Sequence, residues 1–385
     1  MSNLAETVVD AITDASSLIF VAEGAANIIY KIKDHKLSCY LLRLRKKLPS
    51  QPSTLDVYNF NTNHMLPLFP PNTVVSMRLV KVDQAVLGQL NMELDVLERE
   101  GIRDQKRHGT VLDTSESYGI LVENMTAESV RSDLSLMFSG REQVLGTSGL
   151  LSYAVREDRG RKLEVAVLEF KPKWLTQSRD APENWIYCRT CALRRYRAQD
   201  NKSEFGPCPL DLVSGSWQRV EKSVRALLPK QLDITSGMVL TLDRVRTIVT
   251  EFIIRTTVFR SLAQIQENMD EYGVMGTSDS DESINFLIAM TARDCTSFVR
   301  IIYSELDELT TSEAQETSTG NVPVNDASST CIEVDGYSFA VSCRLADLDI
   351  KDASGTKRAY WQSIERNLNV GGWYTSSDAL IVPCR

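Results

Sequence analysis

The sequence predicts a mixed α/β (α+β) fold, organised as one large two-lobed domain or as two packed domains. The chain has 385 residues, and chains longer than roughly 250–300 residues usually divide their core. A hydrophobic content of 43% supplies a sizeable core. Runs with alternating or β-branched residues, typical of strands, occur in both halves of the chain beside segments with helical spacing.

Composition excludes several classes of protein. No apolar run approaches the roughly 20 residues that span a bilayer, and the N-terminus lacks a signal-peptide pattern, so we expect a soluble intracellular protein. Eight scattered cysteines fit reduced thiols rather than a disulfide scaffold. The net charge of -8 argues against broad nucleic-acid affinity. A local basic pocket remains compatible with an acidic protein, because contacts act locally.

The residue pattern of the N-terminal part predicts a strand, a tight turn of small residues and two more strands. Residues 17–22 and 28–32 read as strands around the turn at 23–27, and residues 41–45 form the third. Small residues let backbone N–H groups approach a phosphate closely. The turn is therefore either a phosphate-binding loop or an ordinary hairpin.

The next segments predict a loop, a helix and a further strand. Residues 48–63 are rich in Pro, Ser and Asn, which predicts a loop. Leucines at helical spacing predict a helix over 84–99. Residues 118–124 form an apolar strand that ends in polar side chains.

A strand over residues 163–170 leads into Lys171-Pro172-Lys173. Proline cannot continue a sheet ladder, so the chain leaves the sheet there. The two lysines are two residues apart and proline favours extended backbone, so their side chains are expected to point the same way. Ligands of α/β proteins gather where strands end, although a solvated turn is the alternative interpretation.

Two helices are predicted in the following region. Residues 181–197 have a helical pattern, and Arg189 and Arg197 share one face through steps of four. Two guanidinium groups on one face suit bidentate phosphate contact, and a solvated basic face is the alternative. Residues 242–269 predict one long helix.

Two apolar segments far apart in the chain carry aspartates. Residues 286–298 contain Asp294, and residues 339–351 end in Asp347-x-Asp349-x-Lys351. A carboxylate in apolar surroundings is costly without a cation or donor as partner, and metal-bound phosphate is one such partner. Mg²⁺ prefers few protein oxygens together with substrate phosphates, and Asp349 can join only if the segment stays extended.

Three cysteines raise the question of zinc. Cys188-x-x-Cys191 is followed by Cys208, whereas all three histidines are distant in sequence. Structural zinc takes four ligands. A site of three cysteines plus one further ligand is one interpretation, and packed free thiols are the simpler one.

Four blocks together resemble the inositol-pentakisphosphate 2-kinases, in the order and over most of the length that this family has. The blocks are residues 23–27 (Glu-Gly-Ala-Ala-Asn), 169–173 (Glu-Phe-Lys-Pro-Lys), 209–215 (Pro-Leu-Asp-Leu-Val-Ser-Gly), and 292–295 (Ala-Arg-Asp-Cys) with 347–351 (Asp-Leu-Asp-Ile-Lys). The resemblance implies a two-lobed, protein-kinase-like inositol polyphosphate kinase fold. Residues 1–124 would form the nucleotide-binding lobe, and residues 125–385 the lobe with metal and inositol-phosphate groups.

The resemblance also implies an activity and its residues. The chain would use ATP and Mg²⁺ to phosphorylate the 2-hydroxyl of inositol 1,3,4,5,6-pentakisphosphate. Asp294 would be the base, Lys171 would lie near the transferring phosphate, and Asp294 and Asp347 would be the metal ligands. The nucleotide would be bound by Glu23, Gly24, Ala25, Ala26, Asn27, Arg43, Glu123, Asn124 and Glu169. The acceptor would be bound by Arg107, Lys173, Arg189, Arg197, Lys351, Arg358 and Tyr360.

Two other functions stay open. Val21 and Ala22 replace the usual Arg-Gly before Glu23, which permits a catalytically idle scaffold that still binds inositol phosphates. The cysteines permit a zinc-bearing interaction protein. Under the kinase hypothesis we expect a monomer in the nucleus or cytoplasm, with a small-molecule partner and neither nucleic acid nor membrane.

Overall fold

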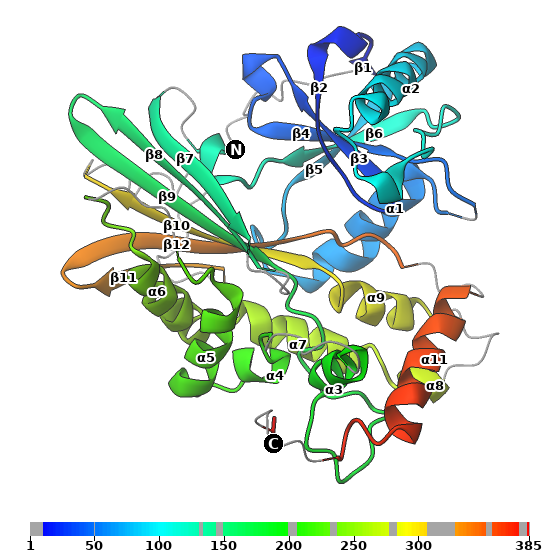
Figure 1. Cartoon of the computed structure of the whole chain (residues 1–385), viewed down its shortest axis with the longest axis vertical. Helices are drawn as coiled ribbons and strands as arrows, with labels where there is room; N and C mark the ends of the chain where they lie inside the picture. The colour runs from blue at the N-terminus through cyan, green and yellow to red at the C-terminus, as the bar shows by residue number, and fades with distance from the viewer. Residues whose placement is uncertain are drawn as a thin grey trace. The chain divides into compact units, whose positions relative to one another are not determined.

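The computed structural model describes residues 11–49, 51–130, 134–143, 149–198, 206–231, 237–276, 283–305, 328–351, 356–376 and 383–384. The chain divides into two compact units, the first within residues 1–63 and 75–124 and the second within 64–74 and 125–385. Each unit holds one six-stranded sheet among the described residues, with helices beside it (Figure 1). The predicted mixed α/β class is confirmed.

The sheet of the first unit has the strand order β1-β5-β6-β4-β3-β2. Its strands are β1 (Ala11–Ile12), β2 (Leu18–Glu23), β3 (Asn27–Ile32), β4 (Tyr40–Arg45), β5 (Met77–Val82) and β6 (Tyr118–Glu123). Strands β2, β3 and β4 pair antiparallel, as the small-residue turn predicts. Gly24 N donates to Asn27 O (2.8 Å) and closes that turn.

Helix α2 (Gln84–Arg99) covers this sheet and matches the predicted helix. Its apolar face buries Leu87, Leu90 and Leu94 in one cluster with strand residues such as Tyr30 and Leu42. Spacing of three and four residues places these leucines on one side of the helix. The helix therefore forms through burial of that face against the sheet.

The predicted loop at residues 48–63 is wrong in its second half, which holds helix α1 (Thr54–Phe60). Ser53 accepts a hydrogen bond from Asp56 N, and the Asp56 side chain accepts one from Ser53 N. This reciprocal capping box satisfies two helix N–H groups that would otherwise lack partners. The Ser53 and Asp56 spacing that forms this cap can be read from the sequence. The loop prediction instead followed the Pro, Ser and Asn content of the segment.

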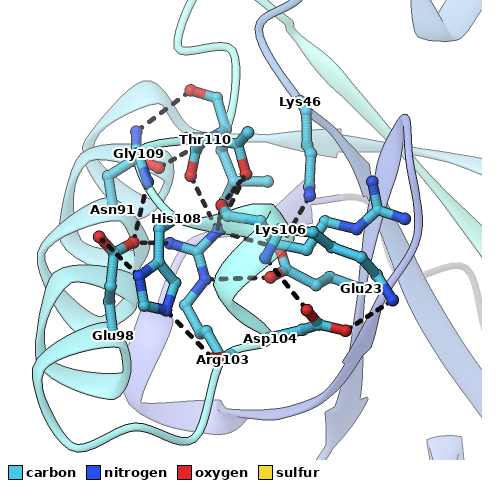
Figure 2. A network of polar contacts seen from close by, with 12 residues as sticks. Glu23, Lys46, Asn91, Glu98, Arg103, Asp104, Lys106, His108, Gly109 and Thr110 are labelled. Atoms are coloured by element: carbon cyan, nitrogen blue, oxygen red, sulfur yellow. Dashed lines mark hydrogen bonds and ion pairs between the residues drawn. The ribbon is translucent and has the colours of Figure 1, made fainter.

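A buried ionic cluster stands beside the turn at residues 23–27 (Figure 2). Arg103 donates through Nε and Nη2 to the two oxygens of Glu23 (3.1 and 3.0 Å). Lys46 Nζ lies 2.8 Å from Glu23 Oε2. The Glu23 side chain is only 4% exposed, and although burial opposes ionisation, hydrogen bonds from Arg103 and Lys46 lower its pKa. Glu23 therefore anchors the turn to the loop that follows α2.

We expect the Glu23→Gln substitution to lower the free energy of unfolding by about 3 kcal/mol near pH 7, because two buried cations lose their counter-charge. The folded-state pKa of Glu23 lies below its unfolded value. Its contribution is therefore complete above the unfolded pKa of about 4.3 and is lost as pH falls through the folded pKa. Denaturant unfolding from pH 7 to pH 3 should show the two proteins converging in acid. Glu100→Gln, at an exposed carboxylate, is the control, and a constant difference at all pH values would contradict the ionic role.

The sheet of the second unit has the order β11-β12-β10-β9-β8-β7. Its strands are β7 (Ser135–Gln143), β8 (Leu150–Asp158), β9 (Arg161–Phe170), β10 (Thr296–Ser304), β11 (Ser329–Val334) and β12 (Tyr337–Ala346). All of its pairings are antiparallel. The predicted strand at 163–170 is confirmed as part of the central strand β9, whose residues Leu163 to Leu168 are almost wholly buried.

Helices pack below this sheet in the view of Figure 1. They are α3 (Arg189–Arg197), α4 (Pro209–Leu212), α5 (Trp217–Leu227), α6 (Leu242–Arg255), α7 (Val258–Asn268), α8 (Gly273–Gly276), α9 (Ile284–Ala292) and α11 (Thr356–Val370). Phe259 of α7 stacks on Phe170 of β9, with ring centroids 5.7 Å apart. Within the described ranges, no helix has both the length and the apolarity to cross a membrane.

Two predicted helices differ from the observed ones. The predicted helix at 242–269 is broken between α6 and α7, because Thr256 is extended (φ −93°, ψ 167°) and its hydroxyl donates to Phe252 O. The predicted helix at 181–197 begins only at Arg189, where the Cys188 sulfur accepts from Cys191 N as a cap. In the first case a side-chain bond to the backbone accompanies the end of a helix, and in the second it caps the start of one.

Candidate active site

The ends of three neighbouring strands bring the predicted site together. Phe170, the last residue of β9, pairs with Ser297 of β10, and Thr296 pairs with Ala346, the last residue of β12. Lys171 directly follows β9, Asp347 directly follows β12, and Asp294 lies two residues before β10. Because neighbouring strands alternate in direction, these three side chains share one edge of the sheet.

Lysines and aspartates contact one another at this edge. Lys171 Nζ lies 2.8 Å from Asp347 Oδ2 and 3.5 Å from Asp294 Oδ1. Lys173 Nζ contacts Asp294 Oδ1, and Lys351 Nζ contacts Asp294 Oδ2, both at 3.0 Å. Five residues from three distant segments therefore form one charged cluster, and both aspartates face the same ammonium group.

The cluster keeps both kinds of group charged. Burial alone would raise the pKa of Asp294, but Lys351, Lys173 and Lys171 together hold it well below its ordinary value. Burial opposes the charged form of Lys171, yet Asp347 and Asp294 raise its pKa above the usual value. Asp294 is therefore a carboxylate throughout the physiological pH range.

Two residues of the cluster adopt left-handed backbone conformations. Lys173 has φ 61° and Asp347 has φ 58°, a region that residues other than glycine seldom adopt, at a cost of roughly 1–3 kcal/mol each. Lys171 and Lys173 converge as predicted, but the backbone between them is not uniformly extended. The chain at Asp347 is not extended either, so the condition for Asp349 as a second metal ligand fails, and Asp349 is buried.

A buried glutamine from α7 ties these segments together. The Gln266 side chain donates to Lys173 O (2.9 Å) and Ala292 O (3.1 Å) and accepts from Leu175 N (2.8 Å). It is fully buried. Gln266 thus links the backbone that carries Lys173 to the backbone that leads into Asp294.

A cavity of about 430 Å³ opens beside the cluster and is lined mainly by α3, α11 and the site loops. Asp294, Tyr360 and Trp361 form part of its wall. Six cationic side chains also line it: Lys173, Arg189, Arg194, Arg197, Arg293 and Lys351. Such a wall suits a ligand with several negative charges.

Two of these arginines are held rigidly against Trp174. The guanidinium carbons of Arg189 and Arg293 lie 4.0 and 3.7 Å from the centroid of the Trp174 ring. Arg189 pairs with Glu365 (2.8 Å), and Arg293 pairs with Asp270 (2.7 Å). Arg189 is thus largely buried, which excludes for this residue the alternative of a solvated basic face. Its charge still contributes to the cavity wall, although one of its N–H groups is committed to Glu365.

Of the other predicted acceptor residues, two line the cavity and two do not. Arg197 donates to the hydroxyl of Tyr360 (3.2 Å), and both residues line the cavity. Arg358 is buried, lies 5.9 Å from the Phe286 ring centroid and does not line the cavity. Arg107 belongs to the first unit, where its carbonyl accepts from Arg103 Nη2 (3.2 Å). Acceptor binding by Arg358 and Arg107 stays a prediction.

The predicted nucleotide residues lie at defined points of the two sheets. Arg43 lies within β4, and Glu123 ends β6 opposite Tyr40. Asn124 N donates to Cys39 O (2.7 Å). Glu169 lies in β9 of the second unit, and burial raises the pKa of its carboxyl although Arg141, 3.8 Å away, opposes this. Their contacts with a nucleotide stay predictions.

Four cysteines gather at a separate place in the second unit. The sulfurs of Cys188, Cys191, Cys208 and Cys384 all lie within 4.8 Å of one another. Tetrahedral Zn²⁺ with Zn–S distances of about 2.3 Å separates its sulfurs by about 3.8 Å. The observed distances of 3.9 Å from Cys188 to Cys208 and 3.5 Å from Cys208 to Cys384 fit that geometry. Cys384 is a fourth cysteine of this cluster, and the sequence did not identify it.

Sequence reasoning missed several residues of the site. Arg293 stands directly before Asp294, inside its motif, and Trp174 stands directly after Lys173, the last residue of another motif. Arg194 lies three residues before Arg197, and residues three apart are neighbours on a helix. The sequence-based prediction considered only residues four apart on this helix, so Arg194 was not identified. Cys384 and Gln266 had no local signal, because each meets its partners only through the fold.

Comparisons with known proteins agree with the pattern of motifs. A family model described as inositol-pentakisphosphate 2-kinase matches residues 20–367. A protein named inositol-pentakisphosphate 2-kinase from Yarrowia lipolytica is 26% identical over 359 residues, covering 91% of this chain and 90% of the relative. A protein of the same name from Debaryomyces hansenii is 25% identical over 386 residues, covering 93% and 92%.

Proposed function

Because the chain belongs to the inositol-pentakisphosphate 2-kinase family, we propose that it transfers the γ-phosphoryl group of ATP to the 2-hydroxyl of inositol 1,3,4,5,6-pentakisphosphate, giving inositol hexakisphosphate. The observation that supports this most directly is the cavity whose wall combines six cations with the Asp294 carboxylate. The relatives carry kinase names, which favours an enzyme over an idle scaffold.

The charge of the acceptor explains the composition of the wall. Each phosphate carries roughly −1.5 to −2 charges near neutral pH, so a pentakisphosphate is strongly anionic. Arg197 and Lys351 reach the cavity from α3 and from the segment after β12, and Lys173 reaches it from the end of β9. Guanidinium groups suit bidentate phosphate contact, and ammonium groups act as point charges.

The geometry suggests how the transfer proceeds. The acceptor oxygen bonds to the γ-phosphorus while the bond from that phosphorus to the bridging oxygen of ADP breaks. Asp294 accepts the hydroxyl proton, and Lys171 and Lys173 stabilise charge on the transferred group. The low pKa of Asp294 makes it a weak base, which suits a loose transition state in which the proton leaves late.

The residues present fit a magnesium site. Asp294 and Asp347 are both partly exposed and both contact Lys171, so the two carboxylates lie close to one another. Two carboxylates together with phosphate oxygens are a typical protein environment for Mg²⁺. Bound there, the ion would neutralise charge on the nucleotide phosphates.

Nucleotide binding is assigned to residues of both sheets. The turn from Glu23 to Asn27 and Arg43 are proposed to face the phosphates, and Glu123 and Asn124 the adenine. Glu169 is proposed as a further nucleotide contact. The protein is proposed to act as a monomer in the nucleus or cytoplasm.

Incubation with ATP, Mg²⁺ and a panel of inositol pentakisphosphates, each with a different free hydroxyl, tests the reaction. Ion-exchange separation should show hexakisphosphate only from the isomer with a free 2-hydroxyl, with one ADP formed per product. Absence of hexakisphosphate from every isomer, or its formation from another isomer alone, would refute the proposal.

We also propose that the four cysteines hold a structural zinc ion. Zinc needs thiolates, and the four sulfurs lie within 4.8 Å of one another, close enough to bind a single ion. The cluster is buried and lies beside the cap of α3, so bound zinc would fix the start of the helix that carries Arg197. One zinc per chain is expected by elemental analysis, and folded, zinc-free protein would leave four packed thiols as the interpretation.

A further inference from the structure

Arg194 differs from the other cations of the cavity in its contacts within the protein. Lys173 and Lys351 contact Asp294, and Arg189 and Arg293 contact Glu365 and Asp270. Among the described residues, the Arg194 guanidinium has no hydrogen bond or ion pair. It is half-buried and lines the cavity, so its charge is available to a ligand.

The position of Arg194 on α3 places it beside a predicted acceptor residue. Arg194 and Arg197 are three residues apart, which makes them neighbours on the helix surface, and both line the cavity. Arg195, between them, instead stacks on Tyr187 at 4.1 Å and donates to Trp373 O (2.9 Å). One face of α3 thus presents two guanidinium groups without a carboxylate partner among the described residues.

Gly206 provides the space that the Arg194 guanidinium occupies. A Cβ atom at Gly206 would lie 2.8 Å from Arg194 Cζ, 2.9 Å from Nε and 3.1 Å from Nη1. Real Cβ atoms essentially never come this close, so any side chain at this position would force the guanidinium to move. Gly206 also lines the cavity, and its φ is not in the left-handed region. The absence of a side chain, rather than backbone freedom, is therefore what this glycine contributes.

We propose that Arg194, kept in place by the missing side chain of Gly206, binds a phosphate group of the inositol polyphosphate acceptor. This inference rests on the proposed function and adds a binding residue to it. A guanidinium without a protein partner forms charge-assisted hydrogen bonds with phosphate without first breaking an ion pair. Arg194 acts on acceptor affinity and not on the transferred group, because it is not in contact with Asp294 or Lys171.

Acceptor affinity of four variants tests the proposal. Arg194→Gln should raise the Kd for inositol pentakisphosphate, measured by calorimetry without ATP, about tenfold, and raise KM similarly with kcat little changed. Gly206→Ala should raise both by about threefold, since a flexible side chain is displaced rather than lost. The double variant should match Arg194→Gln alone, because the two changes act through one contact. Lys222→Gln, at an exposed lysine of α5 outside the cavity, should leave both constants unchanged.

The outcomes separate this inference from the proposed reaction. If wild-type protein forms hexakisphosphate and Arg194→Gln retains wild-type Kd and KM, the inference is wrong and the reaction stands. If wild-type protein binds the pentakisphosphate without turnover, the reaction is wrong, and the calorimetric Kd of Arg194→Gln still decides the role of Arg194. Additive losses in the double variant would refute the role assigned to Gly206.

Discussion

The Asp294→Asn substitution is expected to lower kcat about 10³-fold, because it removes the proposed base, which is also a proposed metal ligand. Affinity for the acceptor should not fall. Asp294 neutralises Lys173 and Lys351, each 3.0 Å away, and asparagine would leave these ammonium groups with more charge for a polyanion. The Kd for inositol pentakisphosphate without ATP is therefore expected to stay constant or to decrease.

Asp335→Asn is a matched control for this experiment. Asp335 lies in the same unit between β11 and β12, is paired with Arg244 at 2.9 Å and is largely exposed. Its φ of 53° suits asparagine, so the same change of charge should leave kcat intact. A kcat for Asp294→Asn within a few fold of wild type would refute its catalytic role. A large rise in acceptor Kd would instead mean that Asp294 mainly organises the lysines.

The Cys384→Ser substitution is expected to lower the free energy of unfolding by about 5 kcal/mol, because loss of one of the four proposed ligands would release the structural zinc ion. Cys384 is anchored by its own backbone, where N donates to Ile186 O (2.8 Å) and O accepts from Arg219 (2.9 Å). The zinc would therefore join this end of the chain to the start of α3. Thermal unfolding with elemental analysis measures both effects together.

Cys331→Ser, at an exposed cysteine of β11 outside the cluster, should change neither stability nor zinc content. A strong zinc chelator should lower the Tm of wild-type protein and leave that of Cys384→Ser unchanged. Equal stability of the two proteins in the absence of chelator would show that the four sulfurs are packed thiols without metal.

Much of the charged cluster could be predicted from the sequence. Lys171, Asp294 and Asp347 each stand beside an apolar strand, and such positions are visible in the pattern of residues. Their convergence follows from the pairing of β9, β10 and β12. Lys351 was found because it shares a short segment with Asp347.

Other parts of the site depended on contacts that a local pattern cannot contain. The helical spacing placed Arg189 and Arg197 on one face, but it could not show that Glu365 holds Arg189. The same spacing did not reveal that the Arg194 guanidinium has no hydrogen bond or ion pair with the residues that the structure describes. The break between α6 and α7 depends on the extended backbone of Thr256. The residues around it are all compatible with a helix, so the sequence pattern does not indicate the break.

The sequence by itself determined the fold class, the strand ends that carry the lysines and aspartates, and the family, because these depend on residue type and short spacing. Only the tertiary structure decided which charges neutralise one another, that Gly206 makes room for Arg194, and that Cys384 completes the cysteine cluster. The physical reason is that side chains far apart in the chain, such as those of Cys208 and Cys384, which are 176 residues apart, meet only after the chain has folded. Their energies then depend on burial and distance, which the order of residues does not contain.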